Sequence, residues 1–391
     1  MSFLTFSRWT LPTLVAVVFL VLASQAKATE FQVERLQENL DQPWALAFLP
    51  ASENFALLIT ERPGRLLYLN PADGNPHSLE GLPEVAVRGQ GGLLDVAVHP
   101  EFDQGENWVY LTFAAANPEG RGYAIHLGRA RLNLDEQRLD DWELLYEATP
   151  YSSGNGHFGS RLAFDDRGYL YMTLGDRRER DSAQDLMSNW GKTLRFHADG
   201  SIPTDNPFVD DNQALDAIYT YGHRNAQGMA WDQQREFLWQ NEHGQQNGDE
   251  INIINHPGGN YGWPRATYGT EYRTGRTIGA LPPDDEGTIN PVYYWLKGHY
   301  GDSGREGFPP SGLAIYYGDE FPQWEGQLLM GNLRHRYLGR FEVKADKPIR
   351  EHEMLMDLGY RIRDVRVHPE SGQIYVLVDD SSAPLLRLVA P

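Results

Sequence analysis

The sequence predicts an all-β protein, a single six-bladed β-propeller. The composition is rich in turn-forming and aromatic residues, with 39 Gly, 24 Pro and 12% aromatic residues, which is typical of many short strands. Apolar residues alternate with a period of two in short segments bounded by turns, and this pattern recurs six times along the chain. Repeating small antiparallel sheets around an axis leaves only short exposed edges. Two stacked β-sandwiches are the alternative.

Each repeat begins with one apolar strand, continues through a turn, and returns in a second strand. Six copies give a spacing of roughly 60 residues, above the ~40–50 residues of common propeller repeats. We expect the last blade to be completed by a strand near residues 31–35, which would close the ring. The first strands of the copies fall at residues 44–50, 94–100, 161–166, 228–232, 312–316 and 364–369.

The N-terminus has the pattern of an export signal. Arg8 is the one charge before an apolar run at residues 9–23, and Ala26-Lys27-Ala28 offers a cleavage site. The pattern predicts a signal peptide at residues 1–28, a mature propeller domain at 29–391, and a periplasmic or secreted location. The run is shorter than the ~20 residues of a spanning helix, so we expect no stable membrane span. An uncleaved anchor is the less favoured alternative.

Charge and cysteine content exclude some classes of function. The net charge is −20 and the chain has no cysteine. Nucleic-acid binding needs a basic face, which this balance argues against. Disulfides and thiol chemistry are impossible, so the exported protein must be stabilised by its core.

Polar residues lie just before several of the first strands. If those strands are innermost, the residues surround one mouth of the central channel. The antiparallel second strands return to the same face, which adds the loops at 176–177, 242–245 and 332–336. Histidine moves protons near neutral pH, and convergent arginines suit a ligand rich in carboxylates or phosphates. The residues before the strands are Gln90, His157, Arg224, Asn225, Arg361 and Arg363.

A second candidate site lies in two glycine-rich segments, at residues 247–250 and 258–264. Carboxylates and exposed carbonyls in such loops suit Ca²⁺, which takes six to eight oxygen ligands. The pattern is not that of an EF-hand. A carboxylate that caps a turn explains it equally well.

At these residues the chain resembles the soluble sugar dehydrogenases that depend on pyrroloquinoline quinone (PQQ), in the aldose sugar dehydrogenase branch of the glucose/sorbosone dehydrogenase family. The matching motifs together cover nearly all of the mature chain, and the family's fold is a six-bladed propeller. They lie at residues 89–94, 98–100, 156–162, 222–228, 242–244, 249–252, 259–264 and 361–365.

The resemblance implies PQQ and Ca²⁺ as cofactors and a role for each matching residue. His157 would be the general base that takes the proton of the sugar's anomeric hydroxyl. The carbonyls of Gly244 and Gln245 would hold the Ca²⁺ that polarises the quinone. Arg224 and Asn225 would hold the quinone oxygens. The remaining implied roles are cofactor carboxylate binding for Arg334, Arg361 and Arg363, pocket lining for Gln90 and Tyr272, and a second, structural Ca²⁺ site for Glu250 and the Tyr261 carbonyl.

Three positions depart from the glucose-specific branch of the family. Gly156 replaces an aspartate expected to contact sugar, Gln245 replaces a proline, and Arg334 stands where a lysine is usual. The loss of a sugar-binding carboxylate favours broad or different aldose use. Arginine in place of lysine keeps the charge and alters its geometry.

We therefore expect an exported quinoprotein that oxidises aldoses to lactones, as a monomer or a homodimer. Without cysteine the chain has no haem-attachment motif, so electrons would leave to a separate acceptor. A Ca²⁺-dependent lactonase is one alternative, although it would need a carboxylate-rich axial site. A non-catalytic propeller that binds a carbohydrate or a protein is the other.

Overall fold

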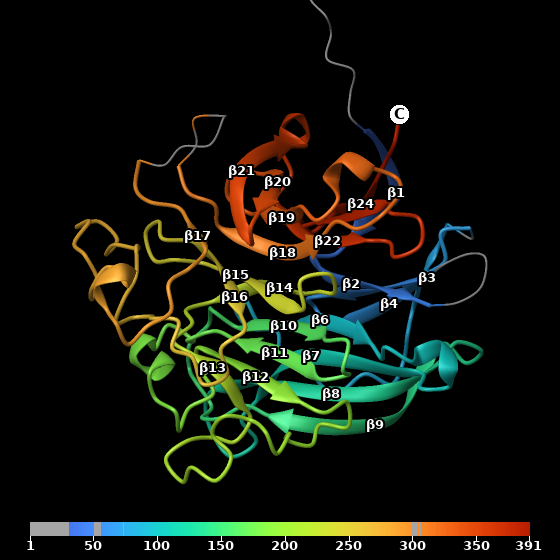
Figure 1. The fold of residues 1–391 in the computed structure, drawn as a ribbon. Helices are drawn as coiled ribbons and strands as arrows, with labels where there is room; N and C mark the ends of the chain where they lie inside the picture. The colour runs from blue at the N-terminus through green and yellow to red at the C-terminus, as the bar shows by residue number, and fades with distance from the viewer. Residues whose placement is uncertain (1–30, 51–55, 73, 299–303, 305) are drawn as a thin grey trace, which may run out of the picture.

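The computed structural model describes residues 31–50, 56–72, 74–298, 304 and 306–391, and in this part of the chain it confirms a six-bladed β-propeller. Six four-stranded antiparallel sheets are arranged about one axis (Figure 1). Each innermost strand packs against the innermost strands of the blades on either side, and β2 also contacts β22, so the ring is closed. This closure rules out two stacked sandwiches. The predicted signal peptide lies outside the described residues.

From the axis outward, the strands of each blade follow chain order, except that the outermost strand of the sixth blade is β1. The first is β2 (Pro43–Leu49), β3 (Ala56–Glu61), β4 (Arg65–Leu69) and β5 (Pro76–Ser78); the second is β6 (Leu93–Val98), β7 (Trp108–Ala116), β8 (Tyr123–Asn133) and β9 (Arg138–Glu147); the third is β10 (Gly159–Phe164), β11 (Leu170–Leu174), β12 (Lys192–Phe196) and β13 (Ile218–Tyr221). The fourth is β14 (Ala226–Asp232), β15 (Phe237–Glu242), β16 (Glu250–Ile254) and β17 (Tyr293–Tyr294); the fifth is β18 (Pro310–Ile315), β19 (Leu328–Asn332), β20 (Tyr337–Lys344) and β21 (Lys347–Met354); the sixth is β22 (Ile362–Val367), β23 (Ile374–Val378), β24 (Ala383–Val389) and β1 (Gln32–Leu40).

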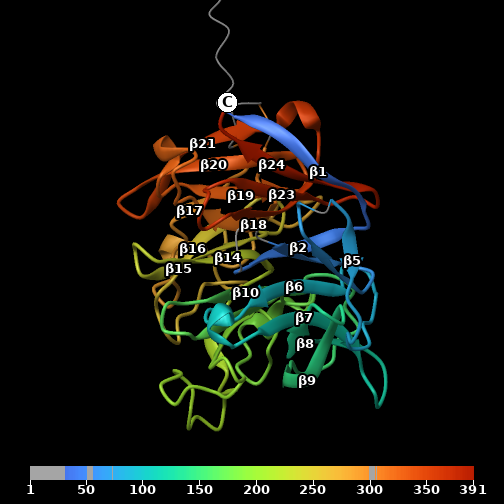
Figure 2. The same ribbon diagram turned by 90° about the vertical axis from the view of Figure 1, so that its right-hand side faces the viewer.

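The sixth blade joins the two ends of the described chain. Strand β1 pairs antiparallel with β24, from Gln32 opposite Val389 to Leu40 opposite Ala383, and the two run side by side in Figure 2. This confirms the predicted closing strand near residues 31–35 and extends it to Leu40. Backbone hydrogen bonds of this blade thus tie the N-terminal strand to the last strand of the ring.

The second strand of a blade is buried on both faces. In β3 and β11 every residue is buried, because neighbouring blades cover the sheet from either side. Such strands are continuous apolar segments, whereas strict alternation describes a sheet with one wet face. The predicted alternation is seen at the end of β8, where buried Ala130 and Leu132 alternate with half-buried Arg129, Arg131 and Asn133.

Helical structure in the described residues consists of 3-10 turns of three or four residues. None of them is long and apolar enough to cross a membrane. They lie at Phe102–Gln104, Arg180–Ala183, Pro282–Asp284, Pro322–Trp324 and Met356–Leu358.

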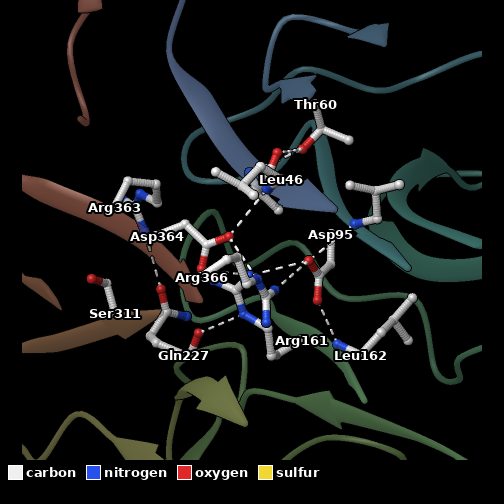
Figure 3. A network of polar contacts seen from close by, with 12 residues as sticks. Leu46, Thr60, Asp95, Arg161, Leu162, Gln227, Ser311, Arg363, Asp364 and Arg366 are labelled. Carbon is white, nitrogen blue, oxygen red and sulfur yellow. Dashed lines mark hydrogen bonds and ion pairs between the residues drawn. The ribbon is translucent and has the colours of Figure 1, made fainter. Parts of the chain in front are cut away.

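Charged residues of three inner strands, β6, β10 and β22, meet in one polar network (Figure 3). The guanidinium of Arg161 on β10 is 1% exposed and pairs with Asp95 of β6 at 3.1 Å and with Asp364 of β22 at 3.2 Å. Arg366 reaches the same two carboxylates, at 3.5 and 3.2 Å. The Leu46 N–H of β2 donates to Asp364 at 3.1 Å. We call Asp95, Arg161, Asp364 and Arg366 the axial network; it links the first, second, third and sixth blades.

Candidate functional site

A cavity of about 690 Å³ opens at the end of the ring where the inner strands begin. Its wall includes Leu94, Gln227 and Arg363. Leu94 and Arg363 precede Asp95 and Asp364 of the axial network in the sequence, and the Gln227 carbonyl accepts a hydrogen bond from Arg161. The network is therefore the floor of the cavity. Ten of the predicted site residues line the wall: Gln90, His157, Arg224, Asn225, Gly244, Gln245, Tyr272, Arg334, Arg361 and Arg363.

His157 sits in a tight turn just before β10, as the glycine-rich sequence predicted. Its φ is +53°, and its N–H donates to Oε1 of Gln90 at 2.8 Å. A Cβ added to Gly175 would lie 2.2 Å from the His157 carbonyl oxygen, so only glycine allows this close approach. The turn holds the imidazole at the mouth of the strand.

Asp176 orients the imidazole of His157. It directly follows β11 and Gly175, and its Oδ1 lies 2.6 Å from Nδ1 of His157. Its Oδ2 accepts a hydrogen bond from the Trp263 indole at 2.8 Å. Burial alone would raise the pKa of Asp176, but the bond and charge of His157, the charge of Arg224 and the Arg178 N–H together hold the pKa below its ordinary value. A carboxylate only accepts, so Nδ1 of His157 carries the hydrogen and Nε2 is the basic atom.

Burial lowers the pKa of His157, and the nearby Arg224 lowers it further, while Asp176 opposes both. The imidazole is therefore neutral at pH 7. This pairing of a neutral histidine with a buried carboxylate is the arrangement of a general base with its orienting partner. Asp176 was placed at the mouth from the sequence, without a role. Its position at the end of the strand paired to β10 is the signal that could have revealed that role.

Arg224 lies against the loop that follows β15. Its backbone N–H donates to Oε2 of Glu242 at 2.6 Å, and its guanidinium donates to the His243 carbonyl at 3.1 Å and to Oε1 of Gln245 at 2.7 Å. The beginning of β14 and the end of β15 are thereby joined at the cavity. Asn225 beside it accepts from the Gly159 N–H at 3.3 Å, which connects it to the His157 turn.

Arg361 and Arg363 share one carboxylate. Asp379, at the end of β23, lies 2.8 Å from the first guanidinium and 3.0 Å from the second. Burial would raise the pKa of Asp379, but the two arginines hold it down at about 2. Arg363 also donates to Oε1 of Gln227 at 3.3 Å (Figure 3). Asp379 was not singled out from the sequence, because a carboxylate that follows the second strand of a blade is usually an ordinary turn residue.

The wall carries more positive than negative charge. It has six arginines against three carboxylates, and within the residues that the structure describes only Arg361 and Arg363 of the six pair with a carboxylate. Unpaired guanidinium groups in a cavity suit a ligand with several anionic groups, as the sequence predicted. The wall arginines are Arg62, Arg178, Arg224, Arg334, Arg361 and Arg363, and the wall carboxylates are Asp249, Glu306 and Asp379.

The segment from Gly244 to Asp249 forms a compact turn in the wall. A Cβ added to Gly244 would lie 2.1 Å from the Asn247 carbonyl oxygen. The Gly244 N–H donates to Asp249 at 3.0 Å, and burial raises the pKa of that carboxyl to about 6. The Gln245 carbonyl accepts from the Tyr272 hydroxyl at 2.8 Å. Backbone carbonyls beside a buried carboxylate are a donor set that fits a hard cation such as Ca²⁺.

Glu250 and Tyr261, predicted for a second metal site, lie outside the cavity wall. Glu250 stands opposite Glu242 across β15 and β16, and Asn252 donates to both, at 2.9 and 3.1 Å. Burial and the neighbouring Glu242 raise the pKa of Glu250 well above its usual range. The ring of Tyr261 stacks on His223, which bonds Glu242 at 2.9 Å. The predicted pair thus belongs to one buried acidic cluster.

No group of three or more His, Cys, Asp or Glu side chains able to hold a metal occurs in the described part of the chain. Cation binding at either predicted position would therefore depend on backbone carbonyls. The sequence resemblance implied such carbonyls at Gly244, Gln245 and Tyr261, together with the carboxylate of Glu250.

The chain is similar in sequence to a known protein family and to an enzyme of Escherichia coli. The family model described as Glucose / Sorbosone dehydrogenase matches residues 40–387. The chain is 41% identical to the aldose sugar dehydrogenase YliI of Escherichia coli K12 over 376 residues, which cover 96% of this chain and 97% of the relative.

Solved structures of aldose sugar dehydrogenases have the same fold as this chain. The soluble aldose sugar dehydrogenase from Escherichia coli, solved in the apo-form, superposes with a TM-score of 0.84 at 39% identity and covers 92% of this chain and 100% of its own. The PQQ-bound aldose sugar dehydrogenase from Streptomyces coelicolor superposes with a TM-score of 0.71 at 27% identity, covering 93% and 99%.

Proposed function

The chain belongs to the glucose/sorbosone dehydrogenase family, and we propose that it is a PQQ-dependent aldose sugar dehydrogenase that oxidises the anomeric carbon of an aldose to the lactone. The observation that carries this proposal is the neutral His157, oriented by Asp176, at the wall of a cavity rich in arginine. The PQQ-bound relative has the same fold.

The residues present fit both cofactors. When bound, PQQ supplies the two-electron acceptor for the sugar's hydride and Ca²⁺ supplies a Lewis acid beside it. Arg334, Arg361 and Arg363 would pair with the cofactor carboxylates, and Arg224 and Asn225 would donate hydrogen bonds to its quinone oxygens. The carbonyls of Gly244 and Gln245 would hold Ca²⁺, while Gln90 and Tyr272 line the pocket. Glu250 and the Tyr261 carbonyl would hold a second, structural Ca²⁺.

His157 is the proposed general base. Its Nε2 takes the proton from the anomeric hydroxyl as hydride leaves the same carbon. Asp176 keeps the hydrogen on Nδ1 and stabilises the imidazolium that forms. The positive charge of Arg224, whose guanidinium is held by the His243 carbonyl and Gln245, stabilises negative charge that develops during the reaction.

The remaining expectations belong to the same proposal. The protein would act in the periplasm or outside the cell after loss of residues 1–28, as a monomer or a homodimer. Electrons would leave to a separate acceptor, since the chain contains no cysteine for haem attachment.

Reconstitution tests the proposed function. The chain from residue 29, purified without cofactor, would be supplied with PQQ and Ca²⁺ together and singly, and reduction of an artificial dye followed with a panel of aldoses. We expect turnover that needs both additions. Absence of turnover, together with no change in the quinone absorbance on mixing, would refute the proposal and favour a non-catalytic binding propeller.

A further inference from the structure

Arg178 is tied to the proposed base through its backbone. It follows Asp176 by two residues, has a φ of +66°, and donates its N–H to Oδ1 of Asp176 at 2.8 Å. This is the oxygen that also bonds Nδ1 of His157. The position of the Arg178 backbone relative to the imidazole is therefore determined by a shared acceptor.

The side chain of Arg178 covers Gly156, the residue before His157. A Cβ built on Gly156 would lie 2.7 Å from Nε and 2.9 Å from Nη2 of Arg178. A side chain at this position would have to displace the guanidinium. Glycine at 156 thus lets a guanidinium occupy the place into which a side chain beside the base would project.

This guanidinium has no carboxylate partner among the described residues. The nearby acidic groups are already engaged, since Asp176 accepts from His157 and Trp263, and Glu179 accepts from the Ser152 hydroxyl. Arg178 lines the cavity and is exposed. Its hydrogen-bond donors are available to whatever lies beside His157.

We propose that Arg178 is a specificity-determining residue that binds an anionic substituent of the aldose, the carboxylate of a uronic acid or the phosphate of a sugar phosphate. This inference rests on the proposed function, since it concerns the substrate of the same site. A reacting carbon must come within about 3–3.5 Å of the groups that act on it, so the body of the sugar passes next to Arg178. Guanidinium binds carboxylate and phosphate in bidentate geometry, and more strongly than it binds a neutral hydroxyl.

The cofactor has other partners for its own negative charge. Arg334, Arg361 and Arg363 belong to the fifth and sixth blades and the loops beside them, whereas Arg178 belongs to the third blade with His157. One set of arginines therefore serves the proposed cofactor, and Arg178 stands where the substrate meets the base. The surplus of positive charge in the wall also stabilises an anionic substrate inside the cavity.

Four variants isolate this role. Arg178→Gln removes the charge and keeps a hydrogen-bond donor, and Arg178→Lys keeps the charge. Gly156→Asp places a carboxylate against the guanidinium, where it forms an ion pair and competes with an anionic substrate. The φ of residue 156 lies outside the left-handed region, so an aspartate there strains no backbone and only the flexible Arg178 side chain must move. Arg88→Gln is the matched control, because Arg88 is exposed near Gly89 of the wall but does not line the cavity.

The experiment compares kcat/KM of the holoenzyme, loaded with PQQ and Ca²⁺, for D-glucose, D-glucuronate and D-glucose 6-phosphate. We expect one or both acidic sugars to be preferred about ten-fold over glucose, with the preferred one identifying a carboxylate or a phosphate ligand. Arg178→Gln and Gly156→Asp abolish the preference, Arg178→Lys retains most of it, and Arg88→Gln leaves it unchanged. PQQ affinity, measured by absorbance titration, stays within about three-fold in the Arg178 variants.

Two results would overturn the inference and leave the proposed function intact. One is a wild-type enzyme that oxidises neutral and acidic sugars equally well. The other is an Arg178→Gln variant in which kcat/KM falls equally for neutral and acidic sugars and PQQ affinity falls as well, since Arg178 would then bind the cofactor. A holoenzyme with no activity on any aldose contradicts the proposed function itself.

Discussion

Two groups of arginines lie along the axis of the propeller, and they differ in how their charges are balanced. In the floor of the cavity, Arg161 and Arg366 share Asp95 and Asp364, and each carboxylate contacts both guanidinium groups. In the wall above it, six arginines face three carboxylates. Removing charges from water is costly unless they are paired, so the floor can be buried and the wall stays open to solvent.

The difference shows how one fold separates structure from recognition. Both groups come from the beginnings of inner strands and adjoining loops, and Arg363 and Arg366 even share β22. Where carboxylates of neighbouring blades meet the guanidinium, the arginine joins the blades. Where they do not, the arginine is available to a ligand.

The largest effect is expected at the proposed base. His157→Ala removes the proton acceptor, so kcat falls by about 10²–10⁴-fold. PQQ affinity, measured by absorbance titration, changes little, because the cofactor is proposed to bind to arginines elsewhere in the wall. His256→Ala is the control, since this histidine is exposed and lies outside the cavity. Undiminished turnover in His157→Ala would remove it as the base.

A large loss of stability is expected from the floor. Asp364→Asn leaves Arg161 and Arg366 with one carboxylate between them, so we expect the free energy of unfolding to fall by about 3–5 kcal/mol, measured by denaturant or thermal unfolding. Arg167→Gln is the control, because the Arg167 side chain is 61% exposed beside Asp165 and such pairs contribute about 1 kcal/mol or less. Equal losses in the two variants would contradict a structural role for the floor.

An intermediate effect separates two arginines of one strand. Arg363→Gln is expected to weaken PQQ binding about 10–100-fold, which corresponds to one charge-assisted hydrogen bond, with little change in stability. Arg366→Gln is expected to lower the melting temperature and to leave PQQ affinity nearly unchanged, because Arg366 pairs with Asp95 and Asp364 in the floor. If both variants lose affinity alike, the floor and the wall are not functionally distinct.

The smallest effect concerns pH. The base acts when it is neutral, so kcat/KM declines as pH falls through the pKa of His157. A free histidine has a pKa of about 6.5, and burial lowers the pKa of His157 below this value. We therefore expect the acid limb of the pH profile to lie below pH 6.5. Asp176→Asn removes a bond that raises the pKa, so the limb moves to lower pH while kcat falls. An acid limb above pH 6.5 would contradict the described environment.

Much of the architecture followed from local patterns. Short apolar segments recurring six times predicted the strands and the number of blades, because period-two alternation and turns are properties of neighbouring residues. That the first strand of each repeat is innermost was an assumption, which the structure confirms. The inner strands and their antiparallel returns predicted that one mouth of the central channel is lined by Gln90, His157, Arg224, Arg361 and the loop after β11. The structure confirms each of these placements.

What only the tertiary structure decided is which charges are paired, and with what. Asp176 meets His157 within the third blade and Asp379 meets two arginines within the sixth, whereas Asp95 and Asp364 come together from different blades and from strands far apart in sequence. The placement of Arg178 over Gly156 likewise depends on a contact between two loops. Ionic contacts act through space at a few ångströms, so the residue types alone determined that a cationic mouth exists, and the fold determined which of its arginines are balanced and which are left for a ligand.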